Sequence, residues 1–215
     1  MQTRRIRLYL RALKRDILVS ISPGFRRAIK WVAFLNIGYF FIEYFVAQGI
    51  GSVSLFADSI DFLEDASVNV LILIALRWSA VHRARVGMVL AGLILIPGLS
   101  TLWMAWQKFM MFIPPSPMPL SLTGAGAFAV NLTCAVLLTQ YRSHSGSLAR
   151  AAFLSARNDV LANVAIVAAG LVTIIYPTAW PDLIVGLCIA MMNLGAAKEV
   201  FEQAREEHQK SSESP

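Results

Sequence analysis

Hydrophobic and polar residues follow one another in long blocks along this 215-residue chain. A helix needs about 20 mostly apolar residues to cross a bilayer, and six windows reach that length: residues 31–50, 53–76, 85–109, 120–140, 151–176 and 180–200. Turn-forming sequences separate most of them, namely GIGS, PPSPMP, SHSGS and YPTAWP. The pattern predicts an all-α, polytopic membrane protein with six transmembrane helices.

Lysine and arginine residues gather on one side of the predicted spans. Nine of them precede the first span, and the second-to-third loop, the fourth-to-fifth loop and the tail carry most of the others. Only Lys108 lies near the opposite side. Because basic residues mark the cytoplasmic side of a membrane protein, we expect both termini to be cytoplasmic.

The composition agrees with a membrane protein and divides the chain into three parts. The chain is 57% hydrophobic, has a mean hydropathy of +0.61 and carries a net charge of +6. Membrane topology accounts for this charge, so we expect no nucleic-acid partner. Residues 1–30 form a basic amphipathic segment suited to an anionic lipid surface, residues 31–200 the transmembrane domain, and residues 201–215 a short polar tail.

Four carboxylates interrupt the predicted second span, at Asp58, Asp61, Glu64 and Asp65. At 100° per residue, three of them and Asn69 fall within an arc of about 80°, while Glu64 lies about 60° outside it. Charged side chains cost several kcal/mol at membrane depth, so they normally face the bundle interior and mark an ion or proton path. The second span therefore presents one polar stripe to its neighbours.

A matching stripe occurs in the fifth span, where Ser155, Asp159 and Asn163 are spaced i, i+4, i+8. The second and fifth spans run in opposite directions. Asp61 and Asp159 each lie about eight residues from a span end, near 12 Å of depth, so the two clusters can meet near the midplane. Arg157 lies about 160° round the helix from Asp159, and we expect it to face away from the site.

The first span supplies a third polar wall, because Asn36, Tyr39 and Glu43 share one face within about 60°. Several carboxylates this close cannot all remain ionised in a low-dielectric setting without a cation. They must bind a metal ion, bind protons, or exchange one for the other, which is the chemistry of an antiporter.

Other readings of these residues remain open. The Asp and Asn side chains could simply hold the helices together through hydrogen bonds. Alternatively, the carboxylate stripe could hold Mg²⁺ for a membrane transferase that acts on a lipid diphosphate, although we find no Gly-rich or Arg-rich motif for the phosphates. We therefore expect a transporter rather than an enzyme.

The motifs resemble those of the cation diffusion facilitator, or cation efflux, family, which exports divalent metal ions in exchange for protons. The resemblance rests on Asn36 and Glu43, on GSVSLFADSIDFLED at 51–65, on SARNDVLAN at 155–163 and on the six-span layout. It covers essentially the whole membrane part. Many members carry a cytoplasmic metal-binding domain after the sixth span, and we expect this chain to be a divergent member that lacks it.

The resemblance also implies a set of metal ligands and supporting residues. The family builds its transport site from an (H/D)xxxD pair on the second span, here Asp61 and Asp65, and a second pair on the fifth span, here Ser155 and Asp159. Ser155 departs from the pattern, since the family has His or Asp there. The supporting residues would be Asp58, Asn163, Glu43 and Asn36.

The implied cargo is a divalent cation, with no permanently bound cofactor. An all-oxygen ligand set favours Mn²⁺ or Mg²⁺ over Zn²⁺, while Fe²⁺ and Co²⁺ remain compatible. The resemblance further implies a homodimer in the lipid membrane, and we expect the inner membrane of a bacterium. A non-transporting relative, in which Ser155 marks a decayed site kept for scaffolding, is the main alternative.

Overall fold

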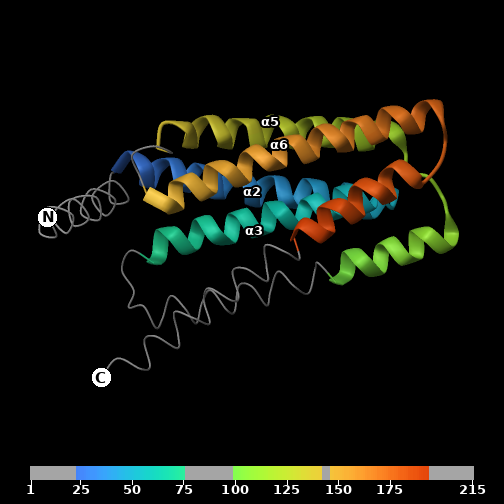
Figure 1. The fold of residues 1–215 in the computed structure, drawn as a ribbon, viewed down its shortest axis with the longest axis horizontal. Helices are drawn as coiled ribbons and strands as arrows, with labels where there is room; N and C mark the ends of the chain where they lie inside the picture. The colour runs from blue at the N-terminus through green and yellow to red at the C-terminus, as the bar shows by residue number, and fades with distance from the viewer. Residues whose placement is uncertain (1–22, 76–98, 142–145, 194–215) are drawn as a thin grey trace, which may run out of the picture.

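The computed structural model describes residues 23–75, 99–141 and 146–193, and within these ranges all secondary structure is helical (Figure 1). The longer helices are α2 (Pro23–Ile50), α3 (Val53–Ala75), α5 (Pro117–Thr139) and α6 (Gly146–Ile175). Shorter helical segments span residues 99–111 and Trp180–Asn193. Residues 1–22 of the basic segment, the start of the third span, the second-to-third loop and the polar tail lie outside the described residues.

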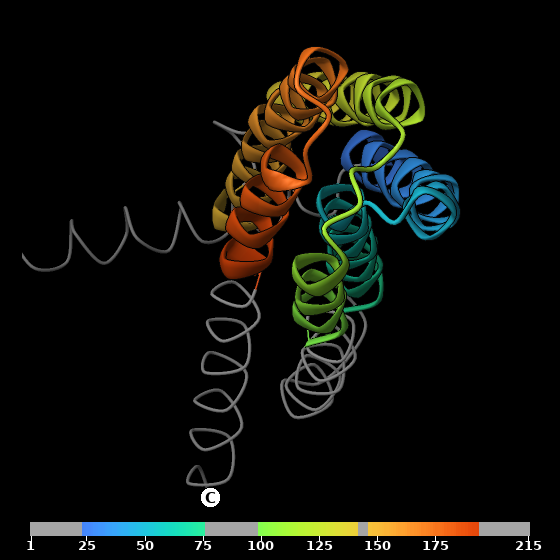
Figure 2. The same cartoon turned by 90° about the vertical axis from the view of Figure 1, so that its right-hand side faces the viewer.

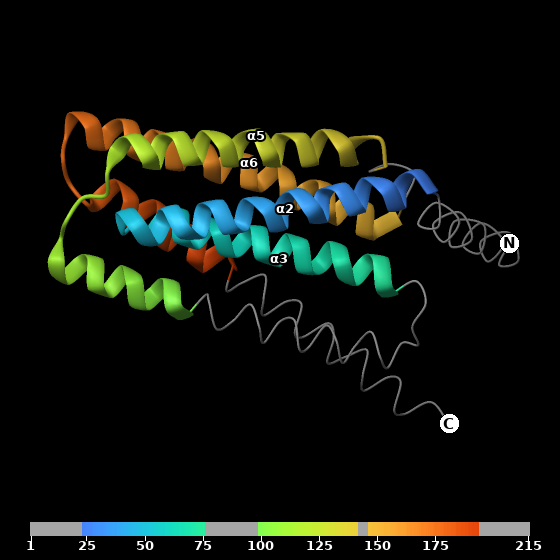
Figure 3. The ribbon, with the colours of Figure 1, turned by 180° about the vertical axis from the view of Figure 1, so that it is seen from behind.

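The helices lie side by side along the long axis of the molecule. The connections at residues 51–52, 112–116 and 176–179 all lie at one end of the bundle, so the helices that each of them joins run antiparallel (Figures 1 and 3). Seen from that end, α5 and α6 lie next to each other, with α2 and α3 beside them (Figure 2). α2 packs mainly on α3, α5 mainly on α6, and contacts of α2 with α5 and of α3 with α6 join the two pairs.

The helix boundaries extend the predicted spans by a few residues. α2 begins at Pro23 rather than at residue 31, because a helix can continue beyond the apolar stretch that hydropathy detects. α5 begins at Pro117, so half of the predicted PPSPMP break is helical. Proline suits the first turn of a helix, where its missing N–H would have no partner and its φ is already helical.

A two-residue turn joins α2 to α3. Gly51 adopts a φ of 63°, a conformation that glycine reaches without steric cost. The next N–H, of Ser52, donates to the carbonyl of Ala47 at 3.0 Å. Lys108, a buried lysine of the 99–111 segment, donates to the Gly51 carbonyl at 2.7 Å. The turn therefore fixes where α3 begins relative to α2 and to the 99–111 segment.

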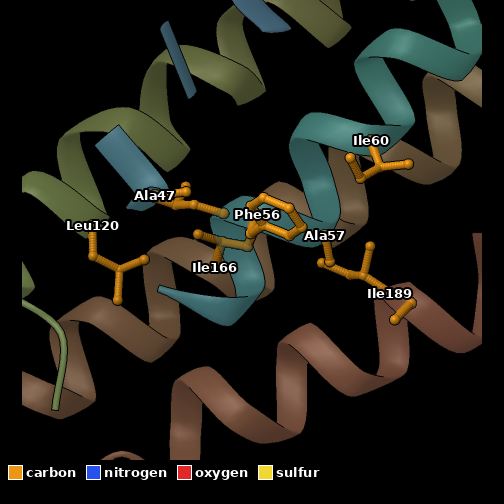
Figure 4. Packing of buried hydrophobic residues seen from close by; sticks show 9 residues of the cluster. Ala47, Phe56, Ala57, Ile60, Leu120, Ile166 and Ile189 are labelled. Carbon is orange, nitrogen blue, oxygen red and sulfur yellow. The ribbon is translucent and has the colours of Figure 1, made fainter. Parts of the chain in front are cut away.

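The central apolar cluster surrounds the first half of α3 (Figure 4). Phe56 and Ile60 of α3 pack with residues of α2, α5, α6 and the Trp180–Asn193 helix, among them Ala47, Leu120, Ile166 and Ile189. Lipid tails are as apolar as these side chains, so close packing rather than water exclusion holds such helices together. Gly186 shows how close the packing is, since a Cβ there would lie 2.7 Å from the Ser54 nitrogen.

The outside of the bundle is apolar. Large hydrophobic side chains on α2, α5 and α6 are more than half exposed, including Phe34, Phe45, Leu122 and Leu161. α2, α5 and the 156–175 part of α6 have the length and hydropathy to cross a membrane, and Trp180–Asn193 is a shorter apolar helix. α3 has the same length as α5, but its interior carries the four carboxylates. The predicted all-α membrane fold is confirmed.

Candidate metal-transport site

The polar stripe of α3 faces the inside of the bundle, as its spacing predicts. α3 is one uninterrupted helix from Val53 to Ala75. Asp58 has no exposed surface and Asn69 is only 3% exposed, while Asp61 and Asp65 are half-buried. Asn69 donates to the backbone carbonyl of Asp65 one turn earlier, at 2.7 Å. The carboxylates therefore lie where neighbouring helices rather than lipid can reach them.

Asp159 of α6 meets the α3 stripe. Its carboxyl group lies within hydrogen-bonding range of Asp65, and the acidic groups of Asp58, Asp61 and Glu64 act on it electrostatically across the interface of α3 and α6. Arg157 is exposed and contacts only its neighbour Asn158 among the hydrogen bonds of the described residues, so the expectation that it faces away is confirmed. Acidic groups of two antiparallel helices thus converge.

Asn163, one turn further along α6, connects three helices. Its amide Nδ2 donates to Asp58 Oδ2 at 2.5 Å, and its Oδ1 accepts from Asn131 Nδ2 of α5 at 3.0 Å. All three side chains are buried. Because both ends of the Asn163 amide are engaged, it holds the Asp58 carboxyl group in one orientation.

The α2 residues that face the site differ in their contacts: Asn36 makes a weak hydrogen bond, Tyr39 makes a hydrogen bond to another helix, and Glu43 has no hydrogen-bond partner. Asn36 donates to Asp65 Oδ2 at 3.5 Å and accepts a long contact from the Cys134 thiol at 3.7 Å. Tyr39 donates its hydroxyl to the Thr123 carbonyl at 2.6 Å, so it ties α2 to α5. Glu43 is fully buried, and neither of its carboxyl oxygens has a hydrogen-bond partner.

These residues lie near one another without forming a closed coordination shell. Among the described residues, no three carboxylate, imidazole or thiol side chains are close enough to hold one metal ion. Ser155 belongs to α6, but its side chain lies outside the part of the chain whose side chains the structure describes. Binding an ion between Asp61, Asp65 and Asp159 would therefore require these groups to draw together.

Asp182 is a buried acid that the sequence analysis did not single out. It accepts from the backbone N–H groups of Val53 and Ser54 at 2.9 and 3.1 Å and from the hydroxyls of Ser52 and Ser54, each at 2.6 Å. It therefore caps the N-terminus of α3 from the Trp180–Asn193 helix. The signal was present as an acid in the first turn of an apolar span, together with SVS at the start of another.

Comparison with known proteins identifies the family. Residues 29–206 match the cation efflux transmembrane domain, which covers most of the chain, including the helices that carry Asp61, Asp65 and Asp159. A search of curated proteins found no match. Cation efflux proteins are transporters rather than enzymes, which fits a membrane bundle with an acidic interior. The chain belongs to the cation efflux family, as a transmembrane transporter of metal cations.

Proposed function

We propose that this protein exports a divalent metal cation from the cytoplasm in exchange for protons, by alternating access. The ion would be bound by Asp61 and Asp65 of α3, by Asp159 of α6, and by Ser155 one turn before Asp159. The observation that carries the proposal is the approach of Asp65 and Asp159 to within hydrogen-bonding range from antiparallel helices. A cation between them would remove the repulsion that two ionised carboxylates would suffer there.

The exchange follows from charge balance in a low-dielectric interior. With no ion present, protonation lowers the free-energy cost of burying the acidic groups inside the bundle. A metal cation that binds there offsets the same cost when the protons leave. Asn36 and Asn163 support the exchange, because they hold Asp65 and Asp58 by hydrogen bonds that a change of cation need not break. The same carboxylates can thus be loaded with a metal ion on one side and with protons on the other.

The ligand chemistry indicates which ions the site would accept. Three carboxylates and a hydroxyl offer oxygen only, and the described residues place no histidine among them. Hard oxygen ligands suit Mn²⁺ and Mg²⁺, whereas imidazole and thiolate favour Zn²⁺. We therefore propose Mn²⁺ as the first ion to test, followed by Fe²⁺, Co²⁺ and Zn²⁺.

A non-transporting role is the second candidate. It is favoured by the absence of three converging ligands among the described residues and by serine at a position where the family has His or Asp. In that case the acidic side chains would only connect helices, and the purified protein would bind no divalent cation.

Transport by the purified protein in liposomes separates the two candidates. We expect Mn²⁺ on one side to drive proton movement in the wild type, and Asp159→Ala to abolish this flux while the protein stays folded. Asn158→Ala is the matched control, because Asn158 is the exposed neighbour on the same helix. Flux in Asp159→Ala equal to that of the wild type would remove Asp159 from the site, and no flux in the wild type would favour the scaffold.

The setting of the transporter belongs to the same proposal. Both termini would face the cytoplasm, which follows from the distribution of Lys and Arg. The protein would act as a homodimer in the inner membrane of a bacterium. Labelling of single cysteines introduced near each terminus, from one side of the membrane, tests the orientation.

A further inference from the structure

Two buried acids lie slightly apart from the proposed ion ligands. Glu43 of α2 and Asp58 of α3 have no exposed surface, and their carboxyl groups lie within hydrogen-bonding range of each other. Asp58 is three residues closer to the 51–52 turn than Asp61, and Asn163 is four residues further along α6 than Asp159. The pair therefore lies about one helical turn from the proposed ion ligands.

The pair lacks hydrogen-bond donors. Asp58 Oδ2 accepts from Asn163, but Asp58 Oδ1 and both carboxyl oxygens of Glu43 have no partner. Buried carboxylate oxygens without a donor cost several kcal/mol. Two carboxylates that face each other are both acceptors, so only a proton on one of them can turn their contact into a hydrogen bond.

No described basic side chain can replace that proton. Lys108 donates to the Gly51 carbonyl and Arg157 is exposed. Lys30 lies 13 residues before Glu43 on α2, about 20 Å away along the helix. The other ionisable groups that face the pair from the packed helices are neutral or acidic, namely Tyr39, Asp61, Asp65 and Asp159.

We propose that Glu43 and Asp58 form a separate proton-binding site that shares one proton and releases it when the cation binds. This inference rests on the proposed function and assigns the exchanged proton to a place. When the ion arrives one turn away, the O–H bond of the pair breaks, the proton passes to water, and the pair becomes doubly charged. The divalent ion supplies the compensating positive charge, so the Glu43–Asp58 pair releases one proton for each ion that the ligands bind.

Calorimetric titration of the purified protein with Mn²⁺ tests the assignment, because repeating it in buffers of different ionisation enthalpy counts the protons released. We expect Glu43→Gln to bind Mn²⁺ and to release one proton fewer per ion than the wild type. The glutamine amide can donate to Asp58 Oδ1, so the pair no longer needs a proton. The slope of the logarithm of the affinity against pH should also be smaller by one, so the affinity should change tenfold less per pH unit than in the wild type.

Asp58→Asn provides an independent second variant, since its amide can donate to Glu43 while its oxygen still accepts from Asn163. It should also release one proton fewer per ion than the wild type, and it decides the question if Glu43→Gln does not fold. Proton release equal to the wild type in the folded variants would overturn the proposal, as would loss of Mn²⁺ binding equal to that of Asp159→Asn. If the wild type itself binds no divalent cation, the proposed function fails first.

Discussion

Asn163 illustrates how a single uncharged residue organises the acidic interior. Its amide donates to Asp58 and accepts from Asn131, so three helices meet at one side chain. Helical periodicity predicted that Asp58 and Asn163 each face the bundle interior. It could not predict that they bond to each other, because the register between two helices depends on packing far from either residue.

Replacing Asn163 should destabilise the bundle. Asn163→Ala leaves the Asp58 oxygen and the Asn131 amide buried without a partner, which should cost about 1–3 kcal/mol. Thermal unfolding in detergent, followed by circular dichroism, would measure the change. Thr133→Ala is the control, since its exposed hydroxyl bonds only within α5. An Asn163→Ala melting temperature no lower than that of the control would contradict the structural role.

At the scale of the element, α3 is held at its first turn by a residue from another helix. Asp182 accepts two backbone N–H groups and two hydroxyls there, and Lys108 fixes the preceding Gly51 carbonyl. Since α3 carries most of the acidic groups, its axial position determines the level at which they meet α6. Asp182 therefore positions the site from a distance.

Removing this cap should affect stability more than the loss of an ordinary surface residue. Asp182→Ala leaves four donors without their acceptor, and we expect a cost on the order of 2–4 kcal/mol. Asp182→Asn keeps one acceptor oxygen, so its stability should lie between that of the wild type and that of Asp182→Ala. The same melting experiment applies, with Thr178→Ala as a control at the same end of the bundle, where one long bond of 3.5 Å is lost. Equal melting temperatures for Asp182→Ala and Thr178→Ala would exclude the capping role.

The elements were predictable to the extent that hydropathy and turn chemistry define them. The apolar windows located α2, α3, α5 and α6 because a span must be long and apolar. The start of α2 was missed because three of the eight residues from Pro23 to Lys30 are basic and lower the mean hydropathy of that stretch. Asp182 was missed because capping in trans leaves no local motif, only an acid and two serines 130 and 128 residues away.

At the scale of the whole molecule, the acidic groups of different helices affect one another and must be considered together. Repulsion among several buried carboxylates favours separation, yet the packing of α2, α3, α5 and α6 holds them together. The sequence indicated the fold and the polar faces, and the match to the cation efflux domain over residues 29–206 supplies the class of cargo. The geometry of the ligand shell could not be predicted, because the register and separation of α3 and α6 are set by packing along their whole lengths.

The set should respond to a metal as a unit. We expect Mn²⁺ to raise the melting temperature of the wild type, because an ion that binds only the folded state stabilises it, by about 2.7 kcal/mol at a hundredfold excess over its dissociation constant. Asp61→Asn should show a much smaller rise. A rise of equal size in both proteins would place the bound ion away from Asp61.

The most direct test of the central claim asks whether Asp65 and Asp159 bind the same ion. Calorimetric titration with Mn²⁺ would compare the wild type, Asp65→Asn, Asp159→Asn and the double variant. If both groups are ligands of one ion, each single substitution should remove most of the affinity and the double substitution should add little more, because the two effects are strongly non-additive. Independent, additive losses, or an affinity unchanged in either single variant, would contradict a site shared by α3 and α6.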